Sequence, residues 1–208
     1  MDCFKAEPTR KKLVVYGDHD TGKTSLLIKF VTRMFPTEYV PPTIESVVVD
    51  MEVDGRRIEL LLGEAEGYST LYKLARVALQ EVDVVLMCFS LTSASSFDSM
   101  PTLVHRVKQY GLHNAPIVMV GTKNDEQLNR VITFEKGLEM AKSVNAFRYV
   151  ECSAKTEEGV SEVFETAVRS VVAKRGRLSA SFFKNRDSRG TDGPAGGKEK
   201  RKRWSHIF

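Results

Sequence analysis

Cysteine is scarce in this chain of 208 residues, and long apolar runs are absent. The three cysteines, Cys3, Cys88 and Cys152, are scattered and odd in number, which argues against a disulfide framework and favours a reducing, cytoplasmic compartment. No window holds eighteen consecutive apolar residues, so the sequence predicts no membrane span. Residues 1–10 lack the apolar stretch of a secretory signal, and we expect none.

Acidic and basic side chains are unevenly distributed along the chain. Of 31 basic and 27 acidic residues, eleven basic and three acidic ones fall in 174–208, which leaves 20 basic and 24 acidic residues in 1–173. A mildly acidic domain is therefore followed by a basic tail that suits an anionic partner. We expect an extension over 1–9, a globular domain over 10–175 and a disordered basic tail over 176–208. The globular part offers no basic stripe, so we expect no specific nucleic-acid partner. We also expect the protein to be a monomer.

Short apolar runs alternate with longer amphipathic segments. The pattern predicts strands over 11–17, 47–53, 57–62, 83–90, 116–121 and 147–151, and helices over 23–34, 95–110, 134–144 and 159–174. Asp54-Gly55, between the second and third strands, is a strong signal for a two-residue hairpin turn. Strands that alternate with helices predict an α/β fold, in which helices cover both faces of a mostly parallel sheet with one antiparallel hairpin near its edge.

A glycine-rich motif lies between the first predicted strand and the first predicted helix. It fits G-x-x-x-x-G-K-[ST] and reads Gly17, Asp18, His19, Asp20, Thr21, Gly22, Lys23, Thr24. Backbone N–H groups of such a loop, and the positive end of the helix that follows, surround a polyphosphate. Lys23 would bridge the β- and γ-phosphates, and the Thr24 hydroxyl would bind Mg²⁺. The alternative is a glycine-rich turn that binds nothing.

Two further loops, each after an apolar strand, carry groups that can recognise a purine base. In the first, which includes Thr122 and Lys123, the Asp125 carboxylate can accept hydrogen bonds from guanine N1–H and the 2-amino group. Adenine offers neither donor, so Asp125 would be left buried and unpaired beside it. The second loop contains Ser153, Ala154 and Lys155, where a backbone N–H can meet guanine O6. Taken alone, Asp125 could equally be a helix cap or an ordinary loop acid.

These motifs together resemble those of a Ras-superfamily small GTPase, and they are most similar to the Rho family. The resemblance covers about residues 10–173 and rests on these segments: 17–24, 35–36, 39–41, 54–55, 85–90, 122–125 and 151–156. It implies a P-loop NTPase fold of the small-GTPase type with a six-stranded sheet, GTP or GDP as ligand, and Mg²⁺. It also implies that Phe35 lies against the guanine ring, although ordinary packing at a helix end is the alternative.

The resemblance further implies two switch segments that report the γ-phosphate to effector proteins and to an exchange factor. The effector surface of the first switch would comprise Tyr39, Val40, Pro41, Pro42, Thr43, Ile44 and Glu45. In the second switch, the Gly67 N–H would meet the γ-phosphate.

The chain departs from the family pattern at the positions for hydrolysis, and no catalytic residue is intact. His19 replaces a glycine beside the γ-phosphate, where its side chain would obstruct the attacking water and an arginine finger. Tyr68 takes the place of the glutamine that orients the water. Asp20 adds negative charge to the cradle, which weakens phosphate binding unless the side chain points to solvent.

The Mg²⁺ ligands are altered as well. Pro42 occupies the position of the threonine that binds the metal, and Thr43 could replace it only if the loop shifts by one residue. Glu64 stands where the family has aspartate. We therefore expect a switch that hydrolyses GTP slowly or not at all and is largely GTP-bound. The alternative is a pseudo-GTPase scaffold with weak or no nucleotide binding.

The end of the chain also differs from the Rho pattern. Only residues 126–131 separate the base-reading aspartate from the next predicted helix, so the extra Rho helix is missing. No cysteine follows Cys152, and we expect no prenylation. The basic run at 198–203, followed by Trp204, is compatible with reversible contact with the inner plasma membrane, which is one hypothesis for the tail. A nuclear-localisation signal and an inert solvated tail are the alternatives.

Overall fold

The computed structural model describes residues 8–37, 47–65 and 82–173. Its strands are β1 (Thr9–Gly17), β2 (Val47–Val53), β3 (Arg56–Ala65), β4 (Val84–Ser90), β5 (Ile117–Thr122) and β6 (Arg148–Glu151). Its helices are α1 (Lys23–Thr32), α3 (Ala94–Asp98), α4 (Met100–Val107), α5 (Phe134–Ser143) and α6 (Val160–Ala173). A π-helical turn at Lys108–Leu112 and a 3-10 turn at Gln127–Asn129 complete the regular structure of this part of the chain. The predicted alternation of strands and helices is confirmed.

The described strands form one six-stranded sheet in the order β2-β3-β1-β4-β5-β6. Only the β2–β3 pair is antiparallel, and every other neighbouring pair is parallel. The predicted six-stranded, mostly parallel sheet is therefore confirmed. Because β1, β3, β4, β5 and β6 run in the same direction, their carboxyl ends meet at one edge of the sheet. The loops that follow these strands are brought together there.

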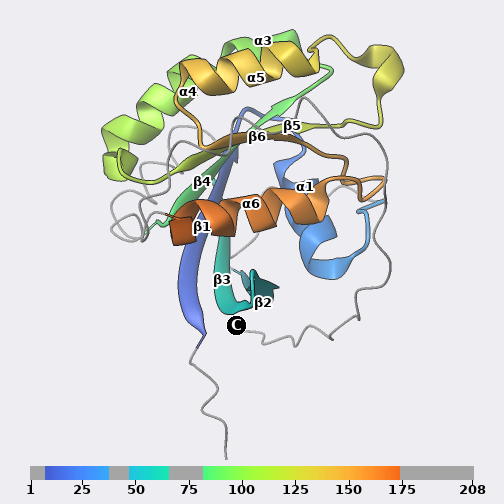
Figure 1. Ribbon diagram of the computed structural model, residues 1–208. Helices are drawn as coiled ribbons and strands as arrows, with labels where there is room; N and C mark the ends of the chain where they lie inside the picture. Colours follow the sequence, from blue (N-terminus) through green and yellow to red (C-terminus); the bar gives the residue numbers. More distant parts are fainter. Residues whose placement is uncertain (1–7, 38–46, 66–81, 174–208) are drawn as a thin grey trace, which may run out of the picture.

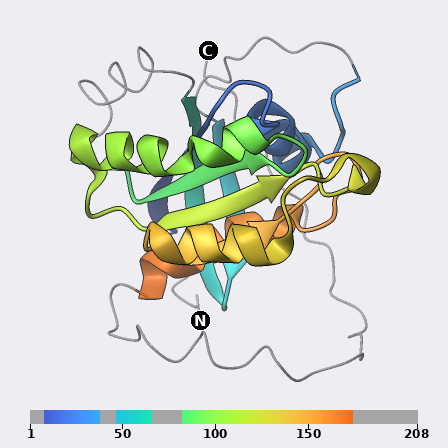
Figure 2. The same cartoon turned by 90° about the horizontal axis from the view of Figure 1, so that it is seen from above.

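Helices cover both faces of the sheet, as predicted (Figures 1 and 2). On one face, α1 and α6 pack together, with the rings of Phe30 and Phe164 stacked at a centroid distance of 3.6 Å. On the other face, α4 contributes Met100 and Leu103 to a second core that also contains Ala141 of α5. All seven residues of β4 are buried between the two cores, which explains its unbroken apolar sequence. Burial of side chains of this size stabilises the fold by about 1.5–3 kcal/mol each.

The hairpin between β2 and β3 turns where the sequence predicts it. Asp54 has φ 50° and Gly55 has φ 75°. Two successive positive φ values belong to the type I′ turn, whose twist matches that of the flanking strands.

The segment predicted as a single helix over 95–110 is helical, but it is divided into separate elements. The structure has α3, then α4, then the π-helical turn in which Gly111 has φ 92°. The break falls at Ser99, two residues before Pro101. Proline has no N–H to bond the carbonyl four residues earlier, and its ring clashes with that carbonyl, so α3 cannot continue through it. Proline is well accommodated in the first turn of a helix, where it stands in α4.

Several predictions fall on residues outside the described ranges. These are the extension at 1–7, the basic tail from 174 on, and the predicted switch residues Tyr39, Val40, Pro41, Pro42, Thr43, Ile44, Glu45, Gly67 and Tyr68. Among the residues that the structure does describe, no helix combines the length and apolar character needed to cross a bilayer. Between Asp125 and α5 the structure has a single 3-10 turn, Gln127–Asn129.

Candidate functional site

The glycine-rich motif forms the loop between β1 and α1 at the edge where the strand ends meet. A Cβ at Gly17 would lie 2.1 Å from the Cys88 carbonyl oxygen, so β1 can pass this close to β4 only with glycine. Farther along the loop, Asp20 has φ 55° and Gly22 has φ 78°. These values turn the loop back on itself ahead of α1, whose N-terminal N–H groups carry a partial positive charge suited to an anion.

The Lys23 ammonium lies over this loop. Its Nζ donates a hydrogen bond of 2.6 Å to the carbonyl oxygen of Asp18, and the Thr21 hydroxyl donates to the same oxygen at 2.8 Å. Lys23 is 2% exposed, so its charge lies within the loop rather than in bulk solvent. A buried ammonium beside a helix N-terminus can hold a phosphate group. His19 and Asp20, by contrast, are exposed. The exposed Asp20 carboxylate is therefore screened by solvent and weakens phosphate binding less than a buried one would.

Side chains from elements distant in the sequence donate hydrogen bonds to the glycine-rich loop. The Thr122 hydroxyl donates to the Thr21 carbonyl oxygen at 2.6 Å and is also 3.0 Å from the Phe89 carbonyl oxygen. Ser99, at the junction of α3 and α4, donates through its hydroxyl to the Asp18 carboxylate. Thr122 thereby links the cradle directly to the loop that was predicted to bind the base.

The two predicted metal ligands in the described part of the chain lie side by side. The Thr24 hydroxyl donates to the Glu64 carboxylate, at 2.8 Å to Oε1 and 3.0 Å to Oε2. Two neighbouring ligands of an octahedral Mg²⁺, each about 2.1 Å from the ion, lie about 3 Å apart. This pair of hard oxygen donors therefore fits Mg²⁺. The described residues contain no cluster of three or more His, Cys, Asp or Glu that could hold a metal.

The two predicted base loops meet beside the cradle. Ser153, fully buried, donates through its hydroxyl to Asp125 Oδ1 at 2.6 Å, and Lys155 Nζ lies 3.9 Å from Asp125 Oδ2. The Asp125 side chain is 14% exposed, so it can accept hydrogen bonds from a ligand. The Asn124 N–H donates to the Cys152 carbonyl oxygen at 3.1 Å, which joins the loops through their backbones.

The remaining predicted base-site residues occupy the same loops or the end of α1. Lys123 has φ 61°, a left-handed conformation that turns the loop between Thr122 and Asp125. Ala154 is half-buried beside Ser153, and Phe35 is 40% exposed after α1. An aromatic ring with this exposure has surface available for a ligand.

The same region contains two thiols that are not reactive. Burial raises the pKa of Cys88 to about 12 and also raises the pKa of Cys152. Both thiols therefore stay protonated at neutral pH, and neither can serve as a nucleophile.

A comparison with protein-family models now gives an independent result. The model described as "Ras: Ras family" matches residues 12–173. The chain belongs to the Ras family. As a Ras-family protein, it has the domain of a small GTPase, a nucleotide-binding switch, and the glycine-rich cradle is the P-loop of that domain. Ras-family proteins bind GTP and GDP, typically with Mg²⁺, and generally interact with effectors and exchange factors.

The Ras-family site also includes contacts that the sequence analysis did not identify. Arg130 and Ser99 belong to none of the recognised motifs, yet Ser99 holds Asp18, and Arg130 contacts both base loops. Their sequence neighbourhoods carry no pattern that distinguishes them. Ser99 lies directly before α4 and Arg130 lies in the loop between the 3-10 turn and α5, so only the fold brings them into contact with the motifs.

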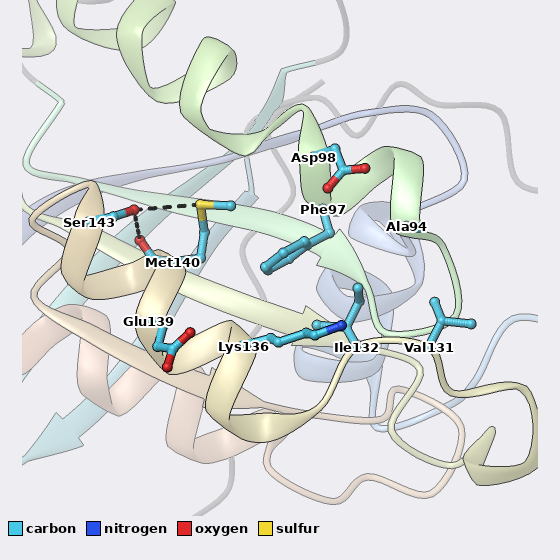
Figure 3. A pocket seen from close by; sticks show the side chains of 9 residues that line it. All are labelled: Ala94, Phe97, Asp98, Val131, Ile132, Lys136, Glu139, Met140 and Ser143. Atoms are coloured by element: carbon cyan, nitrogen blue, oxygen red, sulfur yellow. Dashed lines mark hydrogen bonds between the residues drawn. The ribbon is translucent and has the colours of Figure 1, made fainter.

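A separate hollow of about 590 Å³ lies between α3 and α5 (Figure 3). Its lining includes Phe97, Ile132, Met140, Lys136 and Glu139. No residue of the predicted nucleotide site lines this hollow, so the hollow is not the predicted binding site for the nucleotide.

Proposed function

We propose that this chain is a Rho-like guanine-nucleotide switch that hydrolyses GTP slowly or not at all and is therefore largely GTP-bound. The observation that carries the proposal is the contact between the three loops. Thr122 donates a hydrogen bond to Thr21 of the P-loop, and Ser153 donates one to Asp125. Thr24 and Glu64 bond each other beside the P-loop, where their oxygens would bind Mg²⁺.

Selection of guanine rests on the environment of Asp125. Its carboxylate is largely shielded from water, so an unpaired oxygen would be penalised by about 1–3 kcal/mol. Guanine satisfies it with two donors, N1–H and the 2-amino group, whereas adenine has neither in that position.

Slow hydrolysis rests on the two altered catalytic positions. Tyr68 cannot orient a water molecule as an amide does, and the His19 side chain stands at a position where the family carries glycine. Intrinsic hydrolysis in a Ras-type site is already about 10⁻⁴ s⁻¹, and an arginine finger accelerates it about 10⁵-fold. Without the glutamine amide that orients water, and with His19 in the path of an arginine finger, most of the intrinsic rate and most of the acceleration by an activating protein would be lost.

The Rho assignment and the partners rest on the sequence. We propose that effectors, and an exchange factor, contact residues 39–45, and that the basic run at 198–203 attaches the protein reversibly to the anionic inner plasma membrane. The protein is then cytoplasmic and peripheral to the membrane, with nuclear import as the alternative role of the same basic run. Without the extra Rho helix, partners that require it would not bind.

The purified full chain tests the proposal directly. We expect denaturation to release guanine nucleotide, mostly GTP, and single-turnover hydrolysis to be slower than about 10⁻⁴ s⁻¹. The double variant His19→Gly/Tyr68→Gln is expected to restore measurable turnover, whereas the matched surface substitution His113→Gly is not. An empty pocket, or rapid turnover by the unaltered protein, contradicts the proposal.

The glutamate at position 64, in place of the family's aspartate, favours a second candidate, an interaction scaffold with weak or no nucleotide binding. Glutamate is longer than aspartate by one C–C bond of about 1.5 Å, and here it bonds Thr24 directly. Thermal melting separates the candidates, because a ligand at 100 times its Kd stabilises the folded state by about 2.7 kcal/mol. A melting temperature that does not respond to GTP or GDP with Mg²⁺ supports the scaffold.

A further inference from the structure

Arg130 contacts both base loops, although it belongs to neither. Its Nη1 donates to Asn124 Oδ1 at 3.1 Å in the first loop and to Glu151 Oε2 at 3.0 Å at the start of the second. Its Nη2 donates to Glu151 Oε1 at 2.6 Å, which completes a bidentate pair. Its Nε donates to the Ile132 carbonyl oxygen at 2.7 Å. All three guanidinium nitrogens are therefore used, and the side chain has a single orientation.

Glu151 is in turn held by Tyr149 of the same strand. The Tyr149 hydroxyl donates to Glu151 Oε1 at 2.7 Å. Glycines leave room for the tyrosine on two sides, because a Cβ would lie 2.7 Å from Tyr149 Oη at Gly121 and 2.3 Å from Tyr149 Cζ at Gly137. The carboxylate that Arg130 binds is therefore itself fixed by the packing of β5, β6 and α5.

The ion pair between Arg130 and Glu151 is largely shielded from solvent. The Arg130 and Glu151 side chains are 19% and 13% exposed. A bidentate pair with this little solvent contact is screened less by salt than a surface ion pair. Asn124 stands directly before Asp125, and Glu151 stands two residues before Ser153, so the pair joins the residues that flank the base pocket.

We propose that Arg130 is a positioning residue that holds the loops 122–125 and 151–155 at a fixed separation, and thereby sets affinity and selectivity for the guanine base. The inference rests on the proposed function, since it concerns how the same pocket recognises its ligand. Asp125 and Ser153 come from different strands and bond each other across the gap between these loops. A small increase in that gap would move the Asp125 carboxylate away from the 2-amino group of guanine.

The test compares GDP with inosine diphosphate, which keeps the N1–H but lacks the 2-amino group. Dissociation constants are measured for the full chain with Mg²⁺, for the unaltered protein and for Arg130→Ala, Arg130→Lys and Arg148→Ala. We expect Arg130→Ala to weaken GDP binding about tenfold, the loss expected for a hydrogen bond to a charged group, and to weaken inosine diphosphate binding less. Arg130→Lys should retain only part of the affinity for GDP that Arg130→Ala loses, because lysine cannot form the bidentate pair with Glu151. Arg148→Ala removes an arginine of β6 whose nearest carboxylate, on Glu162, is 4.0 Å away, and should change neither constant.

Asn124→Ala keeps the Arg130–Glu151 ion pair and removes the oxygen that accepts from Arg130, and also from the exposed Gln127 amide, so it provides the test if Arg130→Ala does not fold. We expect it to weaken GDP binding about threefold, again with a smaller effect on inosine diphosphate. If Arg130→Ala and Asn124→Ala lower the melting temperature of the nucleotide-free protein but leave the ratio of the two constants unchanged, Arg130 is merely structural and the inference is wrong. If the unaltered protein binds neither nucleotide, the proposed function fails together with it.

Discussion

The two halves of the candidate site differ in how far they follow the Ras-family pattern. The base half, loops 122–125 and 151–155, keeps Thr122, Asp125 and Ser153 and connects them by short hydrogen bonds. The phosphate half, residues 17–24 with Glu64, keeps Lys23 and Thr24, but it carries His19 and a longer carboxylate at position 64.

In a site of this kind, recognition of the nucleotide and its turnover draw on different groups. Binding needs the backbone of the P-loop, one ammonium and one carboxylate that reads the base. Hydrolysis needs in addition a free path to the γ-phosphate and a group that orients water. A chain can therefore lose the second set while the fold and the first set remain, and each prediction below perturbs one half or the link between them.

The largest effect is expected in the base half, from Asp125→Asn. The amide offers an N–H where guanine also presents donors, so we expect GDP binding to weaken by about three orders of magnitude. Xanthosine diphosphate, which presents a carbonyl oxygen at that position, should bind better than GDP to the variant. Titration of both nucleotides checks this, and Asp98→Asn serves as a matched surface control. A variant that keeps its preference for GDP would refute the base-reading role of Asp125.

The next effect is expected in the phosphate half, from Glu64→Gln. Removing the negative charge leaves Thr24 as the one metal ligand of this pair, and we expect about 100-fold weaker Mg²⁺ binding in the presence of GDP. The release rate of GDP, measured as Mg²⁺ is titrated, reports this affinity. Glu59→Gln removes a carboxylate from the same strand as a control. If Glu64→Gln leaves the Mg²⁺ dependence unchanged, Glu64 does not hold the metal.

Thr122→Val tests the link between the halves. Valine has nearly the shape of threonine but cannot donate to the carbonyl oxygens of Thr21 and Phe89. We expect a loss of about 2 kcal/mol in the free energy of unfolding, because a buried acceptor loses its partner. Urea denaturation measures the loss, and Thr122→Ser, which keeps the hydroxyl, should recover most of it. Equal destabilisation by both variants would mean that packing, not the hydrogen bond, matters here.

The sequence predicts the framework of both halves better than it predicts the contacts that hold them. The strands are recognisable because β4 and β5 are wholly buried and read as apolar runs, and the Asp54-Gly55 turn has a strong local signal. The P-loop and the base loops are recognisable because their chemistry depends on short motifs.

The predictions were weaker where structure depends on residues far apart in the sequence. Weak apolar periodicity predicts one helix over 95–110, but Pro101 divides this segment because it cannot bond the carbonyl four residues earlier. Arg130 could not be identified, because its partners are at positions 124, 132 and 151 and come together only in the folded sheet. Hydrogen bonds of this kind leave no periodic pattern in the chain.

The smallest effect is expected at a surface contact beside the two halves, between Glu157, which follows the second base loop, and the end of α1, which follows the P-loop. Its carboxylate lies 3.0 Å from Lys29 Nζ and 3.0 Å from Arg33 Nη1, both at the end of α1. The hydrogen bond from Lys29, with smaller contributions from the Lys29 and Arg33 charges, lowers the pKa of Glu157 below its usual value of 4.5. A carboxyl group whose pKa is lower in the folded state stabilises the protein above its unfolded pKa and loses that contribution as pH falls through the folded value.

Glu157→Gln should therefore lower the free energy of unfolding at pH 7 by less than about 1 kcal/mol, because the pair is exposed and screened by solvent. The difference from the unaltered protein should shrink as pH falls below 4.5, where the carboxylate becomes protonated. Urea midpoints at pH 7 and at acidic pH measure both values, and Glu158→Gln removes the neighbouring exposed carboxylate as a control. A difference that grows on acidification would have the wrong sign for this mechanism. A difference at pH 7 that persists in high salt would show that Glu157 stabilises its contact with the end of α1 by packing rather than by charge.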